Sequence, residues 1–150
     1  MRIVAVLAAI LLLPASVAWA HGMDDHIPDA RELADLEAKA AVAAPSEQPY
    51  LYAELVHSMT VIATAEYQEG DTRMASQSLK SAQSYAGKIQ MNLAHDAHKL
   101  KDAEIIIRHT AFRLHELLTG ANMNDRPTLE DTITQLNRVQ TELMMQVFQK

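Results

Sequence analysis

The sequence predicts an all-α protein folded as an antiparallel helical bundle. Apolar residues recur between Thr72 and Leu118 at alternating spacings of four and three, the pattern of one helix face that needs helical partners. Aromatic residues make up only 5% of the chain, which favours helix packing over a sheet. The chain has no cysteine, so packing alone must stabilise it. The stripe consists of Ala75, Leu79, Ala82, Ala86, Ile89, Leu93, Ala97, Leu100, Ala103, Ile107, Ala111, Leu114 and Leu118.

The first segment, residues 1–20, is typical of a secretory signal peptide. Arg2 gives the positive start, Ile3 to Leu13 the apolar run, and Ala18-Trp19-Ala20 a cleavage site with small residues where the peptidase needs them. The apolar run is too short for a spanning helix. We therefore expect cleavage after Ala20, no membrane span in the mature protein, and a periplasmic or secreted location.

The charge balance argues against nucleic-acid and anionic-lipid partners. Thirteen Lys and Arg stand against 19 Asp and Glu, a net charge of −6. Binding to phosphates relies on basic side chains, and this chain has too few of them. We expect neither kind of partner.

Two regions follow the signal. Residues 21–45 form an N-terminal segment with a short, alanine-rich helix predicted from Pro28 to Ala44, docked loosely and ended by Pro45. Residues 46–150 form the bundle domain. Its first helix is predicted from near Pro49 to about Gln68, and its apolar side should cover the first half of the stripe.

The turn after this helix is Glu69-Gly70-Asp71. Gly70 can adopt the left-handed conformation that ends a helix, and Asp71 can accept hydrogen bonds from the next helix. A tight turn of this kind predicts that the flanking helices are antiparallel neighbours. The helix that follows, residues 72–118, would measure roughly 70 Å if it is unbroken.

The last helix follows a polar stretch, Thr119 to Arg126, which is suited to a turn. Thr128 and Asp131 resemble a capping box, so this helix is predicted to open at Thr128, run nearly to Lys150 and cover the second half of the long helix. The bundle would then have three main helices, the central one long, plus the short N-terminal helix.

The hairpin region resembles one tetratricopeptide repeat. Ala63 stands at the small position of its first helix, Gly70-Asp71 at its turn, and Ala75, Leu79 and Ala82 at the small, bulky, small positions of its second helix. The resemblance implies that the second helix ends at Gly87 and that the protein forms a curved groove for a peptide. The unbroken apolar rhythm implies instead a helix that continues through Gly87. The whole chain also resembles uncharacterised exported bacterial helical proteins, which implies no activity.

Seven histidines are the unusual feature of the composition. Four residues return to one side of the predicted long helix, opposite the stripe: His95, His98, Asp102 and His109. A transition metal needs three or four ligands around one ion, and two histidines one turn apart supply only half of them. We interpret this side as a solvated polar face, and His57 and His115 as isolated polar residues.

Two further metal hypotheses are weaker. After cleavage, His21 would carry a free amine beside its imidazole, a chelate that favours Cu(II), with Met23 or His26 nearby. A helical bundle can also hold haem between an axial Met and His, for which Met59, His57 and His115 are the candidates. No pattern selects an axial pair, so we expect no metal and no cofactor.

Catalysis is not predicted, because acids and bases alternate along helices instead of converging. Glu104 lies beside the stripe and is expected to pair with Arg108 one turn away. At the end of the chain, four residues in five are apolar, more than one buried stripe requires, and they predict a partner surface: Met144, Met145, Val147 and Phe148.

The sequence therefore predicts an exported, non-catalytic helical protein that acts as an interaction or structural module of the cell envelope. A protein partner is expected, and self-association remains open. The alternative is a periplasmic protein that binds a metal or haem through its histidines.

Overall fold

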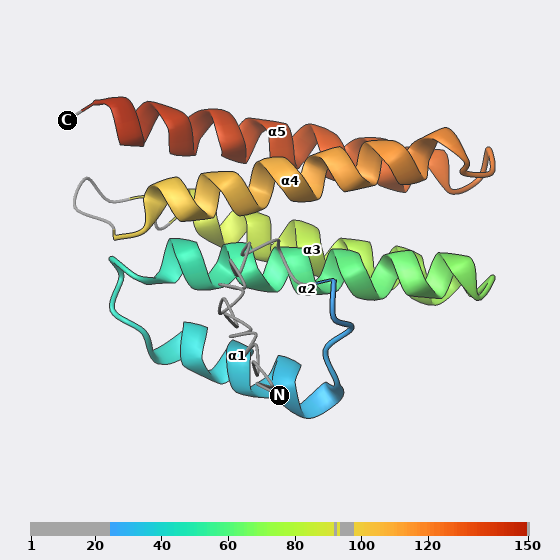
Figure 1. The fold of residues 1–150 in the computed structure, drawn as a ribbon, viewed down its shortest axis with the longest axis horizontal. Coiled ribbons are helices and arrows are strands. Elements are labelled where there is room, and N and C mark those ends of the chain that lie inside the picture. The colour runs from blue at the N-terminus through green and yellow to red at the C-terminus, as the bar shows by residue number, and fades with distance from the viewer. Residues whose placement is uncertain (1–24, 92, 94–97, 150) are drawn as a thin grey trace, which may run out of the picture.

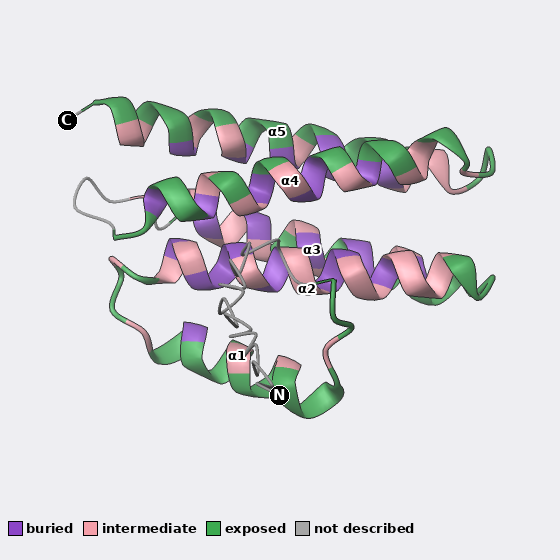
Figure 2. Ribbon diagram, in the orientation of Figure 1, coloured by how far each residue is buried: buried purple, intermediate pink, exposed green. Residues whose placement is uncertain are grey.

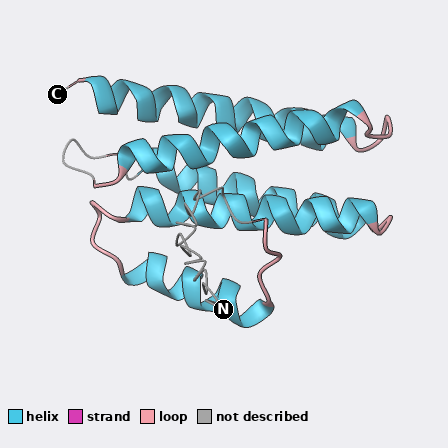
Figure 3. Ribbon diagram, in the orientation of Figure 1, coloured by secondary structure: helices cyan, strands magenta, loops and turns pink. Residues whose placement is uncertain are grey.

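The computed structural model describes residues 25–91, 93 and 98–149, and their regular structure is entirely helical (Figure 3). This confirms the predicted all-α bundle. None of the described helices combines the length and the hydropathy needed to cross a membrane. The five helices are α1 (Ala30–Val42), α2 (Gln48–Gln68), α3 (Thr72–Met91), α4 (Leu100–Thr119) and α5 (Arg126–Phe148).

The bundle consists of two helical hairpins lying side by side (Figure 1). Helices α2 and α3 form one hairpin, and α4 and α5 form the other. Helix α2 also contacts α4, and α3 also contacts α5, so the four long helices enclose one core. Helix α1 lies outside the bundle against α2.

The two hairpins point in the same direction, which the polar contacts between α3 and α5 show. Gln83 Nε2 donates to Thr132 Oγ1 at 2.8 Å, and Gln90 Nε2 donates to Glu142 Oε1 at 3.0 Å. Residue numbers rise together along both helices, so α3 and α5 are parallel neighbours. Within each hairpin, by contrast, the helices are antiparallel.

The prediction of one long central helix is wrong. Helix α3 continues through Gly87 but ends at Met91, α4 begins at Leu100, and the bundle has four main helices instead of three. Lys99 has a φ of 56°, a left-handed conformation that a continuous helix cannot contain. The break has a packing reason. In a single straight helix, each half would be covered by one other helix, whereas α3 and α4 each contact two other helices in the observed bundle.

Ten of the thirteen predicted stripe residues are nevertheless buried, and Figure 2 shows the buried segments along α2 to α5. Leu93 and Leu118 are half-buried, and Ala97 lies outside the described residues. The apolar rhythm therefore identified the buried residues correctly and the path of the chain incorrectly. A fully buried Leu or Ile side chain contributes about 1.5 to 3 kcal/mol relative to an exposed one. The largest fully buried aliphatic side chains are Leu55, Leu79, Ile89, Ile107, Leu114, Leu129, Leu136 and Leu143.

The predicted turn between α2 and α3 is confirmed. Gly70 has a φ of 82°, and its N–H donates to the Tyr67 carbonyl at 3.1 Å. The Asp71 N–H donates to the Glu66 carbonyl at 2.9 Å, and these two bonds form a Schellman motif. Asp71 Oδ1 then accepts from the Met74 N–H at 3.1 Å, so the same residue caps the start of α3.

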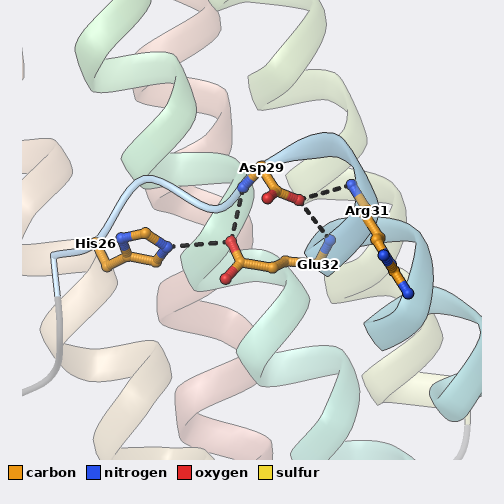
Figure 4. Close-up of polar contacts among 4 residues, drawn as sticks. All are labelled: His26, Asp29, Arg31 and Glu32. Carbon is orange, nitrogen blue, oxygen red and sulfur yellow. Dashed lines mark hydrogen bonds and ion pairs between the residues drawn. The ribbon is translucent and has the colours of Figure 1, made fainter.

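Helix α1 begins with a capping box (Figure 4). Asp29 Oδ1 accepts from the N–H groups of Arg31 and Glu32, both at 2.8 Å, and Glu32 Oε2 accepts from the Asp29 N–H at 2.8 Å. The His26 ring lies 3.1 Å from the same Glu32 oxygen. The Asp29 N–H and His26 together lower the pKa of Glu32. Ala40 is the buried residue of this helix, so its attachment is slight, as its short apolar face predicted.

The predicted capping box at Thr128 is wrong, because α5 begins two residues earlier, at Arg126. Pro127 fits within the first turn, where its fixed φ suits a helix and its missing N–H is not needed. Arg126 Nη1 donates to the Leu118 carbonyl at 3.1 Å and so satisfies an acceptor at the end of α4. Helix α5 then runs to Phe148, in agreement with the prediction.

Candidate functional site

An apolar groove lies between the start of α4 and the end of α5. Lys101 and Glu104 line it from α4, and Met144, Val147 and Phe148 line it from α5. Its volume is about 240 Å³. The two helix ends meet because the α4–α5 hairpin is antiparallel.

Exposed apolar side chains surround this groove. Met144 and Phe148, which line the groove, are 42% and 77% exposed. Met145, next to Met144 on α5, is 50% exposed, and Leu143 is fully buried. The predicted excess of apolar residues at this helix end therefore lies on the surface. Exposed apolar side chains that gather over a hollow are typical of a site that another molecule covers.

Charged and polar groups hold one edge of the groove. Glu104 Oε1 lies 3.2 Å from Arg108 Nε, which confirms the predicted ion pair, and it also accepts from Gln140 Nε2 at 3.0 Å. The carboxylate thus joins α4 to α5. An ion pair one turn apart and partly exposed contributes about 0.3 to 0.5 kcal/mol, so its main effect is to fix the groove's shape.

The structure does not place the four predicted polar residues on one helical face. His95 lies outside the described residues. His98 precedes α4, where its N–H donates to the Ser46 carbonyl at 2.8 Å. Asp102 is exposed, and His109 is half-buried on the side of α4 that faces α2. Among the described residues, no three His, Cys, Asp or Glu side chains are close enough together to hold a metal ion.

His57 is not isolated, which corrects the prediction. Its ring lies 6.3 Å from that of His109, measured between centroids, and His57 Nδ1 lies 3.3 Å from Thr110 Oγ1. His109 Nδ1 is buried and has no hydrogen-bond partner within the described part of the chain. The sequence could not show this pair, because it depends on the packing of α2 against α4.

The remaining candidates are dispersed. His115 is exposed on α4, and Met59 is 8% exposed within the core. His21 and Met23 lie outside the described residues, and His26 contacts Glu32 at the start of α1.

An ion pair closes the α2–α4 side beside His57. Arg113 Nη1 donates to both carboxylate oxygens of Asp25, each at 2.7 Å. The hydrogen bond from Arg113 lowers the pKa of Asp25, and the nearby imidazoles of His57 and His109 add to this effect. A second pocket, of about 130 Å³, lies at this point. Nothing in the sequence links residues 25 and 113, so reasoning from spacing missed this contact.

Comparisons of this chain with protein-family models, with curated proteins and with solved structures found no match.

Proposed function

We propose that this protein is a non-catalytic interaction module of the cell envelope that binds an amphipathic helix of a protein partner in the α4–α5 groove. The observation that supports this proposal is the pair of exposed apolar side chains that line the groove, Met144 and Phe148. Its location in the envelope rests on the signal peptide predicted at residues 1–20.

A helix is the occupant that suits the groove. A groove between two packed helices accepts the apolar face of a third helix, which inserts side chains spaced one turn apart. Methionine side chains are flexible and polarisable, so Met144 can adapt to the residues that enter. Lys101 and Glu104 at the edge offer opposite charges that can fix the orientation of the partner.

Photocrosslinking from two positions tests this proposal. A benzoylphenylalanine placed at Met144 should crosslink to one protein in envelope extract, and the crosslinked peptide should have the apolar spacing of an amphipathic helix. The same probe at Lys80, an exposed residue of α3 on the other hairpin, should give no such product. Equal products from both positions, or a crosslink to a second copy of this chain, would contradict the proposal.

A pair of substitutions sharpens the test. Phe148→Asp places a charge over the groove and should lower the Met144 crosslink at least fivefold. Val42→Asp is the matched control, because Val42 is 85% exposed on α1, away from the groove. It should leave the yield unchanged, whereas an equal fall in both variants would show a loss of folding instead of a lost contact.

The alternative function, metal or haem binding in the periplasm, is favoured only by the His57–His109 pair. The rings of these two residues lie 6.3 Å apart, measured between centroids, and His57 Nδ1 lies 3.3 Å from Thr110 Oγ1. Elemental analysis and absorption spectroscopy of protein purified without a histidine tag separate the two functions. Stoichiometric zinc, copper or haem would favour the alternative.

A further inference from the structure

We propose that Met144 is a site of reversible oxidation, at which a peroxide converts the thioether to a sulfoxide that Gln140 binds and that makes the α4–α5 groove polar. The inference deepens the proposed function, on which it rests for its effect on a partner helix. The oxidation itself and the contact with Gln140 can be measured without any partner.

The Met144 sulfur is open to a soluble oxidant. The chain has no cysteine, so methionine supplies its only sulfur atoms. Met144 is 42% exposed and lines the groove, whereas Met59 is 8% exposed within the core. Because oxidation of a thioether follows its exposure, a peroxide reaches Met144 readily when no partner covers the groove, and it reaches Met59 poorly.

The reaction with hydrogen peroxide is a transfer of one oxygen atom. A lone pair of the Met144 sulfur attacks a peroxide oxygen, and the S–O bond forms as the O–O bond breaks. The departing hydroxide takes the proton of the transferred oxygen and leaves as water. The sulfur loses two electrons and the peroxide gains them. The product is a sulfoxide, which methionine sulfoxide reductases convert back to the thioether.

Gln140 is placed to bind this product. Its Nε2 lies 4.0 Å from Met144 Sδ, one turn away on α5, and 3.0 Å from Glu104 Oε1 on α4. A side-chain amide has two hydrogens, so Gln140 can donate one to Glu104 and the other toward Met144. A thioether sulfur is only a weak acceptor. The second hydrogen of Gln140 is therefore poorly used in the reduced protein.

The sulfoxide oxygen is a much better acceptor for that hydrogen. An oxygen bonded to Met144 Sδ can approach the Gln140 amide to an ordinary N–H···O distance of about 2.9 Å. Glu104 keeps its own hydrogen bond from Gln140, so oxidation extends the existing link between α4 and α5 and does not break it. The fold should therefore tolerate this sulfoxide.

The same change alters what the groove can bind. A sulfoxide is polar, and its oxygen prefers water to the apolar face of an incoming helix. Phe148 and Val147 remain apolar beside it. Because a buried polar group is costly unless all its hydrogen bonds are made, oxidation of Met144 should weaken the binding of an amphipathic helix roughly fivefold or more.

Hydrogen peroxide treatment of the full chain, followed by peptide mass spectrometry and NMR of side-chain amides, tests the modification. Met144 should be oxidised roughly tenfold faster than Met59. The Gln140 amide protons should shift downfield as oxygen replaces sulfur as their acceptor, and they should return after treatment with sulfoxide reductases. Oxidation of Met144 no faster than that of Met59, or an unshifted Gln140 beside fully oxidised Met144, would overturn the proposal.

Two leucine variants form the matched pair for this measurement. Met144→Leu removes the reacting sulfur, so peroxide should leave the Gln140 amide unshifted even though Met145 is oxidised. Met145 is 50% exposed on the next position of α5, and Met145→Leu should show the same Gln140 shift as the original chain. A Gln140 shift in peroxide-treated Met144→Leu would contradict the assigned contact.

A crosslinking experiment tests the effect on the partner. The chain carries benzoylphenylalanine at Val147, is treated with peroxide and freed of it, and is then added to envelope extract. The crosslink should fall roughly fivefold or more in this chain, and in the Met144→Leu background it should not change with peroxide, whatever its starting level. No crosslink before oxidation would contradict the proposed function, whereas a crosslink that survives full oxidation of Met144 would overturn this inference alone.

Discussion

Gly87 and Gly70 are two glycines with opposite structural roles. Gly87 lies inside α3, and a Cβ added there would meet only Gln135 Nε2, at the ordinary contact distance of 3.9 Å. Gly70 has space around it but a φ of 82°. The difference between them is therefore one of backbone conformation and not of crowding.

Gly87→Ala should raise the free energy of unfolding by about 0.5 to 1 kcal/mol, because alanine loses less backbone freedom than glycine in a helix interior. Gly70→Ala is the contrasting variant and should lower it by about 1 kcal/mol or more, since the left-handed conformation disfavours a Cβ. Urea unfolding measures both. A loss of stability in Gly87→Ala would contradict the helical conformation of this residue.

The raised pKa of Tyr50 predicts how the stability of the protein falls at alkaline pH. Burial first, and then the hydrogen bond that its hydroxyl donates to Glu54, raise the pKa of Tyr50 to about 12. An unfolded tyrosine ionises near pH 10. Between these values the unfolded state loses the proton more readily, so the contribution of Tyr50 is complete below about pH 10 and is lost as the pH rises toward 12.

The measurement is the thermal unfolding midpoint between pH 9 and 12. Tyr50→Phe should show a shallower decline than the original chain. The unfolding midpoint of Tyr50→Phe should still fall somewhat with rising pH, because burial also raises the pKa of Tyr67. Parallel curves for the two proteins would show that Tyr50 ionises freely in the folded state.

At the level of single residues, the sequence predicted those features that local spacing determines. Gly70, the Glu104–Arg108 pair and the apolar excess from Met144 to Phe148 all follow from neighbours within one or two turns. The His57–His109 pair and the contact of Asp25 with Arg113 depend on distant segments. Spacing along the chain holds no information about such contacts.

Among the helices, α1 depends most on the hydrogen bonds that cap its N-terminal end. Asp29 Oδ1 satisfies two N–H groups of the first turn. Helix α1 packs against α2, and a hydrogen bond from the Tyr85 hydroxyl to Glu37 joins it to α3. Asp29→Ala should lower the stability of this helix by about 0.5 to 2 kcal/mol. Amide hydrogen exchange of residues 30–42 should then be faster, while that of α3 is unchanged.

Asp35→Ala is the matched control, because Asp35 is an exposed carboxylate within the same helix. It removes an equal charge but no cap, so exchange in α1 should stay close to that of the original chain. Equal acceleration in both variants would attribute the effect to charge and not to capping.

The break between α3 and α4 was the element that sequence reasoning could not find. Apolar residues spaced alternately four and three apart indicate which residues of a helix are buried. The spacing is the same whether two helices pack along one long helix or four shorter helices pack around one core. Gly87, where the tetratricopeptide resemblance implied a break, lies inside α3, as the apolar rhythm predicted, and α3 ends only at Met91. The chain turns between α3 and α4 because both hairpins enclose a common core. That enclosure is a property of the whole fold and not of the local sequence.

At the scale of the whole molecule, one measured distance can distinguish a single long helix from the paired hairpins. Thr72 and Glu116 line the same pocket, so the start of α3 and the end of α4 lie at the same end of the bundle. Spin labels at Arg73→Cys and Glu116→Cys should therefore give a distance far shorter than the roughly 65 Å of a straight helix at 1.5 Å per residue. The absence of native cysteine makes the labelling specific.

Labels at Lys101→Cys and Glu116→Cys provide the internal standard for this measurement. Both positions lie on α4, so their separation of roughly 22 Å is the same in either arrangement. A distance near 65 Å for the first pair, with the standard unchanged, would restore the continuous helix.

Residues 92–99, which join the α2–α3 hairpin to the α4–α5 hairpin, have a consequence for assembly. If residues 92–99 became helical, α3 and α4 would merge, and the α4–α5 hairpin would leave its own α2–α3 hairpin. Two such chains could exchange hairpins and rebuild every α2–α4 and α3–α5 contact between molecules, which is domain swapping. Replacing residues 92–97 with alanine should therefore raise the dimer fraction above that of the original chain in analytical ultracentrifugation. An unchanged dimer fraction would show that the packed hairpins, and not the sequence between them, set the path of the chain.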